Sequence, residues 1–165
     1  MTASTVPDGA RASVVTVSNR SYAGTREDTA GPLLADGLRD LGFAVSDVIV
    51  VPDEVDRIQA ALQAAVDRRD DLVVTTGGTG FTPQDVTPEA TRPLLEREAP
   101  GLADAVRQQG RDAVPTAILS RGVAGIVGGT IVVNLPGSPG GVRDGVAALA
   151  PVIGHAVAQL RGGDH

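Results

Sequence analysis

Short apolar runs rich in valine alternate with segments whose apolar residues recur at helical spacing. The runs at 12–18, 43–51 and 71–76 have the β-branched composition of buried strands. Between them, the spacing predicts a helix through Leu33 and Leu41 that ends at Gly42, and an amphipathic helix over 54–69. Further helices are predicted from Thr87 as N-cap with Pro88 as the first helical residue, over 101–113, briefly over 115–120, and from Val142 to Leu160 with a break at Pro151.

Two apolar runs late in the chain, 122–127 and 130–134, are joined by Gly128 and Gly129, which predicts a β-hairpin. The strand–helix alternation before them predicts a three-layer α/β/α fold with a mostly parallel sheet, to which the late hairpin adds an antiparallel edge. A length of 165 residues suits one domain. We therefore expect a single α/β domain over 12–162, preceded by a disordered N-terminal tail over 1–11.

Several predicted loops leave the strands in the same direction. They lie at 19–29, 52–54, 77–85 and 135–141. Because ligands of such sheets bind beyond the carboxyl ends of the strands, we expect the chemistry of these loops to converge on one site.

Missing residue types restrict that chemistry. The chain has no Cys and no Lys, all 14 basic residues are Arg, and there are 2 His. These absences exclude thiolate nucleophiles, Cys-ligated metals, a lysine Schiff base and the lysine of a P-loop. Carboxylates, hydroxyls, arginines and backbone amides remain, a set that suits Mg²⁺ and phosphates.

Charge and hydropathy disfavour two classes of partner. The net charge of −6 argues against nucleic acid, whose binding domains usually carry a basic stripe. No apolar run approaches the roughly 18–20 residues that span a bilayer. The first 11 residues also lack the apolar core of a signal peptide, so a cytoplasmic location without membrane contact is expected.

The segment at 75–80 combines glycines and threonines directly after a predicted strand. Glycines allow positive φ and close approach of the backbone to a ligand, and successive N–H groups can form an anion nest. A tight strand-to-helix turn without a ligand is the alternative. The predicted phosphate-binding residues are Thr75, Thr76, Gly77, Gly78, Thr79 and Gly80.

Asp53 and Asp85 follow the ends of two predicted strands. Mg²⁺ prefers one or two carboxylates together with phosphate oxygens, so this pair predicts a magnesium site beside the phosphate loop. Helix capping is the alternative for each residue.

Two further loops offer anion contacts. Gly137 and Ser138 precede the last predicted helix, whose N-terminus can bind an anion; a rigid turn set by the neighbouring prolines is the alternative. Ser18 ends the first predicted strand and Arg20 follows it, where Arg20 could neutralise phosphate charge, although an exposed loop explains them nearly as well.

Three motifs together are typical of a known family. The sequences TTGGTG at 75–80, DVTPEA at 85–90 and NLPGSP at 134–139 resemble the MogA/MoaB family of molybdenum cofactor biosynthesis, as do VPDE at 51–54 and PTAILSR at 115–121. The resemblance implies a molybdopterin-binding α/β domain that forms a homotrimer. MogA-like members adenylylate molybdopterin with Mg²⁺-ATP, release pyrophosphate, and pass the product to a MoeA-type molybdate-inserting protein.

The resemblance also implies roles for particular residues. Asp53 and Asp85 take the essential carboxylate positions, and residues 75–80 and Ser138 fall on pterin- and phosphate-binding loops. Asn19 stands where many members have Asp, which weakens any metal or nucleotide contact there. The main alternative is a non-catalytic trimer of the MoaB type that binds or carries molybdopterin.

Overall fold

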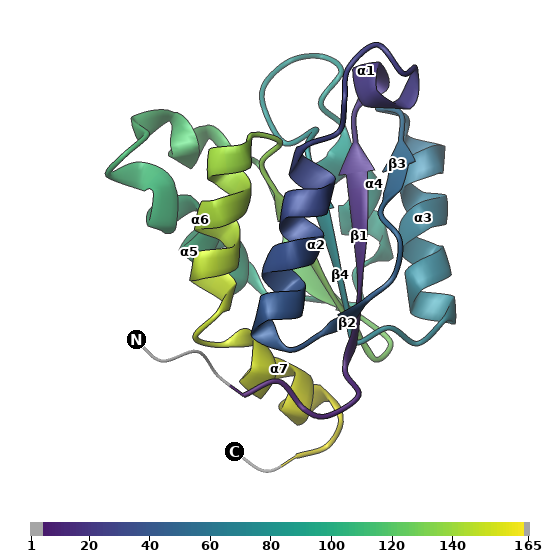
Figure 1. Cartoon of the computed structure of the whole chain (residues 1–165), viewed down its shortest axis with the longest axis vertical. Coiled ribbons are helices and arrows are strands. Elements are labelled where there is room, and N and C mark those ends of the chain that lie inside the picture. The colour runs from purple at the N-terminus through teal and green to yellow at the C-terminus, as the bar shows by residue number, and fades with distance from the viewer. Residues whose placement is uncertain (1–4, 164–165) are drawn as a thin grey trace.

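A mixed sheet of seven strands forms the middle layer of the computed structural model, which describes residues 5–163 (Figure 1). The strand order is β2-β1-β4-β7-β6-β5, and β3 also pairs with β1. The pairs among β1, β2, β3, β4 and β7 are parallel, whereas β6 runs antiparallel to both β7 and β5. The strands are β1 (Arg11–Val17), β2 (Ala44–Val45), β3 (Ile49–Val51), β4 (Leu72–Thr76), β5 (Arg97–Glu98), β6 (Ala124–Val127) and β7 (Thr130–Leu135).

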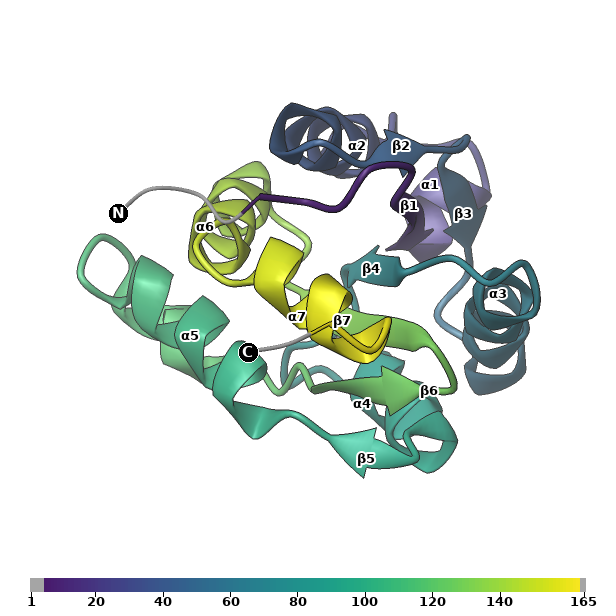
Figure 2. The same cartoon turned by 90° about the horizontal axis from the view of Figure 1, so that it is seen from below.

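Helices cover both faces of the sheet (Figure 2). One apolar cluster joins one face to α2, α5, α6 and α7, and the other joins the opposite face to α3 and α4. The predicted three-layer architecture is therefore confirmed. The helices are α1 (Asn19–Tyr22), α2 (Ala30–Leu41), α3 (Val55–Asp67), α4 (Thr87–Thr91), α5 (Pro100–Arg111), α6 (Pro139–Leu149) and α7 (Ile153–Leu160), with 3₁₀ turns η1 (Arg92–Leu94) and η2 (Pro115–Leu119).

The central strands are buried on both sides because each side chain along them meets a helical layer. In β1, Val14 belongs to the first cluster and Val15 to the second, and in β4 Val74 and Val73 divide in the same way. Each such side chain contributes roughly 1.5–3 kcal/mol through removal from water. This two-sided burial explains why these strands appear in the sequence as continuous apolar runs.

Several predicted boundaries differ from the structure. The run 43–51 forms two short strands, and the loop at 19–29 begins with helix α1. The last helix divides into α6 and α7 around Pro151, as predicted. Strand β5 gave no sequence signal because its two residues, Arg97 and Glu98, are both charged and exposed.

The prediction of a disordered tail over 1–11 is wrong for residues 5–11. Val6 and Ala10 are buried in the first apolar cluster, and β1 already begins at Arg11. Residues 1–4, the rest of the predicted tail, lie outside the described part of the chain, as do 164–165. The domain bounds 12–162 stay a prediction.

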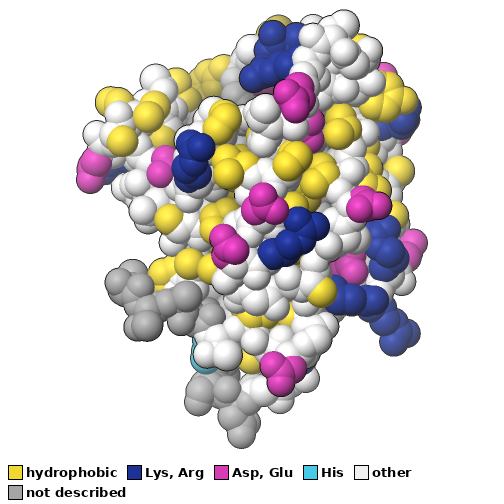
Figure 3. Space-filling model, viewed as in Figure 1, with side chains coloured by type: hydrophobic (Ala, Val, Ile, Leu, Met, Phe, Trp, Pro, Cys, Tyr) yellow, Lys and Arg dark blue, Asp and Glu magenta, His cyan; other side chains and the backbone are white. Residues whose placement is uncertain are grey.

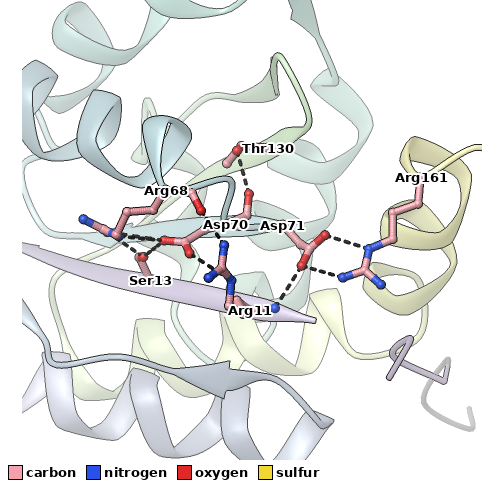
Figure 4. Close-up of polar contacts among 7 residues, drawn as sticks. All are labelled: Arg11, Ser13, Arg68, Asp70, Asp71, Thr130 and Arg161. Atoms are coloured by element: carbon pink, nitrogen blue, oxygen red, sulfur yellow. Dashed lines mark hydrogen bonds and ion pairs between the residues drawn. The ribbon is translucent and has the colours of Figure 1, made fainter. Parts of the chain in front are cut away.

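An ion-pair network ties α7 to the amino ends of β1 and β4 (Figure 4). Arg161 donates to both carboxylate oxygens of Asp71 at 2.8 Å, and the Arg11 N–H donates to the same carboxylate at 2.9 Å. Beside it, the Asp70 carboxylate accepts from Ser13 and pairs with Arg68. The network fixes the end of the molecule opposite the carboxyl ends of these strands.

The charge on the surface and the length of the helices can be compared with what nucleic-acid binding and membrane insertion require. On the face shown in Figure 3, basic side chains lie among acidic ones, so this face carries no basic stripe. Within residues 5–163, no helix is both long enough and apolar enough to cross a membrane.

Candidate functional site

The loops after β1, β3, β4 and β7 meet at the carboxyl ends of these strands, at the upper end of the molecule in Figure 1. The Ser18 N–H donates to the Val51 carbonyl at 3.0 Å, which joins the first two loops. The Gly77 N–H donates to the Leu135 carbonyl at 3.1 Å, which joins the other two. The predicted convergence of the loops is therefore confirmed.

Gly77 and Gly78 form a turn that only glycine allows. Their φ angles are +100° and +69°, and a Cβ on Gly77 would lie 2.3 Å from the Val17 carbonyl oxygen. Thr87 secures this turn, because its hydroxyl donates to the Gly77 carbonyl at 2.9 Å and its N–H to that of Gly78 at 3.1 Å. Val86, not the predicted Thr87, is the N-cap of α4, because Thr87 is already the first residue of the helix.

The threonines of this loop serve mainly to hold it together. Thr75 has no exposed surface, accepts a hydrogen bond from Asn134 at 3.0 Å and lines neither of the cavities described below. The Thr76 hydroxyl donates to the Pro136 carbonyl at 2.7 Å and links both glycine-rich loops. Thr79 is buried too, and its hydroxyl accepts from Ser120 at 3.3 Å.

Two cavities flank the glycine-rich loop at 135–141, and both have Gly137 and Ser138 among their lining residues. The polar cavity, of about 290 Å³, reaches from Thr76 and Gly77 to Arg26 and Asp28. The apolar-walled cavity has Gly78, Thr79, Gly80 and Asp85 on one side and Val114, Ala117 and Leu119 on the other. The predicted phosphate loops therefore border both cavities.

Gly137 packs directly on the first loop. A Cβ at this position would lie 3.1 Å from the Gly77 Cα. Ser138 is the N-cap of α6, and its hydroxyl accepts from the Gly141 N–H at 3.0 Å. The positive end of the α6 dipole is thus directed toward the cavities that Ser138 borders.

Asp53 forms a reciprocal pair with Asn19. The Asn19 N–H donates to Asp53 Oδ2 at 3.0 Å, and the Asp53 N–H donates to Asn19 Oδ1 at 2.8 Å. Burial raises the pKa of Asp53, the Asn19 N–H lowers it, and the charge of Asp85 raises it further, with a net increase. Asp53 does not cap α3, since no side chain caps this helix.

Asp85 closes a turn of its own loop. Its Oδ2 accepts from the Thr82 N–H at 3.0 Å and from the Thr82 hydroxyl at 2.9 Å. No side chain caps α4 either, so capping explains neither predicted carboxylate. The charge of Asp85 contributes to the raised pKa of Asp53, so the two carboxylates lie within electrostatic reach of each other.

The carboxylates at the site limit the kind of metal ion that it can hold. Among residues 5–163, no three Asp, Glu or His side chains gather closely enough to hold a metal by themselves. Two carboxylates that lie against the glycine loop fit, in number and type, a Mg²⁺ ion that takes its other ligands from phosphate and water. They do not fit a cage built wholly of protein ligands.

Of the arginines near the site, the structure favours a different one from the prediction. Ser18 lines the polar cavity and caps α1 by accepting from the Ser21 N–H at 3.1 Å. Arg20 is exposed on α1 and lines neither cavity, whereas Arg26 lines the polar cavity. Both residues lie in the predicted loop at 19–29, and only the α1 turn decides which of them faces the cavity.

Asp28 and Arg121 also lie at the site but were not among the site residues predicted from the sequence. Asp28 accepts from the Thr16 hydroxyl at 2.8 Å and from the Gly31 N–H at 3.0 Å at the wall of the polar cavity. Arg121 lies in the quoted PTAILSR motif, and its guanidinium contacts the Gly80 and Asp85 carbonyls. The motif indicated that position, but not its partners.

Comparison with known proteins decides the family. The family described as "Probable molybdopterin binding domain" matches residues 13–155. The chain belongs to this family. The predicted MogA/MoaB resemblance is thereby confirmed.

Known members of the molybdopterin-binding family match over most of the chain. The molybdopterin adenylyltransferase of Helicobacter pylori strain J99 is 38% identical over 152 residues, which cover 90% of this chain and 86% of that protein. The molybdenum cofactor biosynthesis bifunctional protein of Synechococcus elongatus is 41% identical over 157 residues, 95% of this chain but 49% of that protein. The chain thus spans about half the length of this relative.

The fold agrees with a solved member of the family. The crystal structure of a molybdopterin biosynthesis protein from Mycobacterium abscessus superposes with a TM-score of 0.89 at 50% identity, covering 93% of this chain and 97% of that one. The strand order and helical layers described above are therefore those of the family.

Proposed function

We propose that this chain is a molybdopterin adenylyltransferase, which transfers AMP from Mg²⁺-ATP to molybdopterin and releases pyrophosphate in molybdenum cofactor biosynthesis. The observation that carries the proposal is the pair Asp53 and Asp85, whose carboxylates lie against Gly78 and Gly80 of the first glycine-rich loop. Asp85 also lines the apolar-walled cavity, whereas Asp53 lines neither cavity. The name of the Helicobacter relative supports the same activity.

The reaction forms one P–O bond and breaks another. The terminal phosphate oxygen of molybdopterin attacks the α-phosphorus of ATP, and the bond from this phosphorus to the bridging oxygen breaks. Its electron pair leaves with pyrophosphate. Such transfers depend on positioning and charge neutralisation rather than on a protein nucleophile, which suits a chain without Cys or Lys.

The residues divide these tasks. Asp53 and Asp85 would hold Mg²⁺, which when bound neutralises phosphate charge. The N–H groups of Gly78 and Gly80, together with the α6 N-terminus at Ser138, would bind phosphate oxygens. Two cavities on either side of Gly137 and Ser138 provide separate space for the two substrates.

Pyrophosphate release tests the proposal. The purified protein with molybdopterin, ATP and Mg²⁺ should yield pyrophosphate and adenylylated pterin. Asp53→Asn and Asp85→Asn should each lower turnover at least about 100-fold, because several kcal/mol of charge stabilisation is lost. Asp47→Asn, on an exposed position outside both cavities, is the matched control.

The same assay separates the enzyme from a MoaB-type carrier. Binding of molybdopterin without pyrophosphate release by the unaltered protein would contradict the enzymatic proposal. Full activity of both Asp53→Asn and Asp85→Asn would instead contradict the assignment of these two residues to the site.

We further propose that the chain forms a homotrimer and passes its product to a MoeA-type protein. An apolar groove between α5 and α6, lined by Leu102, Ala105, Ala148 and Val152 among others, offers a surface for the self-association. Light scattering after size exclusion should give three times the chain mass of 16.7 kDa. The mass of a single chain would contradict the trimer.

A further inference from the structure

The loop from Gly80 to Asp85 carries one of the proposed magnesium ligands on an exposed segment. Phe81 is 70% exposed, and Thr82, Pro83 and Gln84 are exposed as well. A segment with so little apolar burial opens readily unless hydrogen bonds hold it. The position of Asp85 therefore depends on the contacts at the two ends of this loop.

Arg121 contacts both ends. Its Nε donates to the Gly80 carbonyl at 2.8 Å, and its Nη2 donates to the Asp85 carbonyl at 2.9 Å. Its backbone N–H donates to the carbonyl of Thr79, the residue before the loop, at 2.8 Å. One planar guanidinium thus spans the beginning and the end of the loop.

The guanidinium is itself held in place by α4. Glu89 accepts from Nη1 at 2.7 Å and from Nη2 at 3.2 Å, a two-point pair that orients the plane of the guanidinium. The hydrogen bond from Arg121 lowers the pKa of Glu89, so the pair stays charged near neutral pH. The charge of Arg121 is therefore balanced by Glu89.

A second arginine anchors the backbone on both sides of Arg121. Arg107, on α5, donates to the Ser120 carbonyl at 3.2 Å and to the Gly122 carbonyl at 2.9 Å. The loop is thereby connected through Arg121 to α5, which is anchored in the first apolar cluster by Ala103 and Val106. Such a connection transmits the rigidity of the core to Asp85.

Arg121 binds the main chain of Asp85 and leaves its carboxylate to other partners. Thr82 occupies Oδ2, and no hydrogen bond from residues 5–163 reaches Oδ1. We propose that Arg121 is a positioning residue that holds Asp85 in the geometry needed to bind the metal–nucleotide complex. This role rests on the proposed adenylyltransferase function.

Hydrogen exchange tests the role without relying on activity. In Arg121→Gln, the amides of Thr82 and Asp85, which donate hydrogen bonds within the loop, should exchange at least about tenfold faster, because the two ends of the loop lose their shared donor. Arg111→Gln, an exposed arginine on α5, is the matched control and should leave this exchange unchanged. Unchanged exchange in Arg121→Gln would overturn the positioning role.

Kinetic measurements then distinguish a displaced Asp85 from a general loss of structure. Arg121→Gln should lower kcat/KM for Mg²⁺-ATP about 100-fold, as expected for a displaced catalytic group, while the Kd for molybdopterin stays within about twofold. Arg121→Lys should recover little, because one ammonium cannot span both carbonyls and Glu89. Full recovery by Lys, or an equal loss of molybdopterin affinity, would overturn the proposal. Absence of turnover in the unaltered protein would overturn the proposed function instead, whatever the exchange result.

Discussion

Asp53 is a carboxylate whose surroundings favour its neutral form. Burial raises its pKa first, the Asn19 N–H partly offsets this, and Asp85 adds like charge. A side chain chosen only for stability would avoid this position. The unfavourable charge is instead what a cation shared by Asp53 and Asp85 would relieve.

We expect Asp53→Asn to stabilise the metal-free protein at pH 7. Because the folded-state pKa of Asp53 is raised, the folded protein binds more protons than the unfolded chain between the two pKa values, and stability falls as pH rises through this window. The variant removes this penalty and should melt up to about 2–4 °C higher, since solvent limits the effect to roughly 1 kcal/mol. Thermal unfolding in EDTA measures the difference.

This difference in melting temperature should disappear as the pH is lowered through the raised pKa of Asp53, because the unaltered carboxyl then becomes protonated and is uncharged like the Asn side chain. Asp47→Asn, at an exposed position, is the control and should show no such pH dependence. A variant that melts below the unaltered protein at pH 7 would contradict this account of Asp53.

At the polar cavity, we expect Arg26 and not Arg20 to contact substrate phosphate. Arg26→Gln removes a cation that lines the cavity and should raise KM about tenfold, the loss of roughly 1.4 kcal/mol of charge-assisted hydrogen bonding. Arg20→Gln changes an equally exposed arginine on α1 and should leave KM within about twofold. Steady-state kinetics with each substrate varied measures KM for both variants. A larger rise in KM for Arg20→Gln than for Arg26→Gln would instead support Arg20, the residue predicted from the sequence.

The turn formed by Gly77 and Gly78, directly after β4, shapes the site. The sequence indicated that these glycines allow positive φ, and Gly77 and Gly78 adopt it; their binding of phosphate stays a prediction. The contact with Val17 was not predictable, because it depends on the pairing of β1 with β4. Thr75 shows the same limit, since only its pairing partner in β7, Asn134, shows that its hydroxyl is buried.

Gly77→Ala should destabilise the fold severely. The new Cβ would meet the Val17 carbonyl at 2.3 Å in a backbone conformation that costs Ala about 1–3 kcal/mol before any clash. Gly101→Ala, in α5 with open space around it, should instead be neutral or stabilise by up to about 1 kcal/mol. Urea unfolding of both variants measures the contrast, and equal stabilities would contradict it.

At the scale of the whole molecule, the ends of the sheet have different tasks. The carboxyl ends carry the candidate site, and the amino ends carry the network that attaches α7 through Asp71 and Arg161 (Figure 4). Burial raises the pKa of Asp71, but the hydrogen bonds from Arg161 and Arg11 outweigh it and lower the pKa below its ordinary value. The network therefore stabilises the fold while Asp71 is ionised.

Arg161→Gln should cost about 1–3 kcal/mol at pH 7, between the values for exposed and buried pairs, because Asp71 is buried and Arg161 is partly exposed. The contribution is present above the unfolded-state pKa of Asp71 and is lost as pH falls through the lowered folded-state pKa. Denaturant unfolding across this pH range measures it. Arg39→Gln breaks an exposed pair and should cost less than about 1 kcal/mol; an equal loss in both variants would contradict the role of Asp71.

The sequence by itself determined the layers, the late hairpin and the loops that form the candidate site, because apolar periodicity, proline and glycine act over a few neighbouring residues. It also placed Asp53 and Asp85 at strand ends, and its motifs indicated the family. Tertiary structure decided which of these side chains reach a cavity: Arg26 instead of Arg20, and Thr79 but not Thr75. It also decided that Arg121 holds the Asp85 loop. These outcomes depend on contacts between residues far apart in the chain, which no local pattern records.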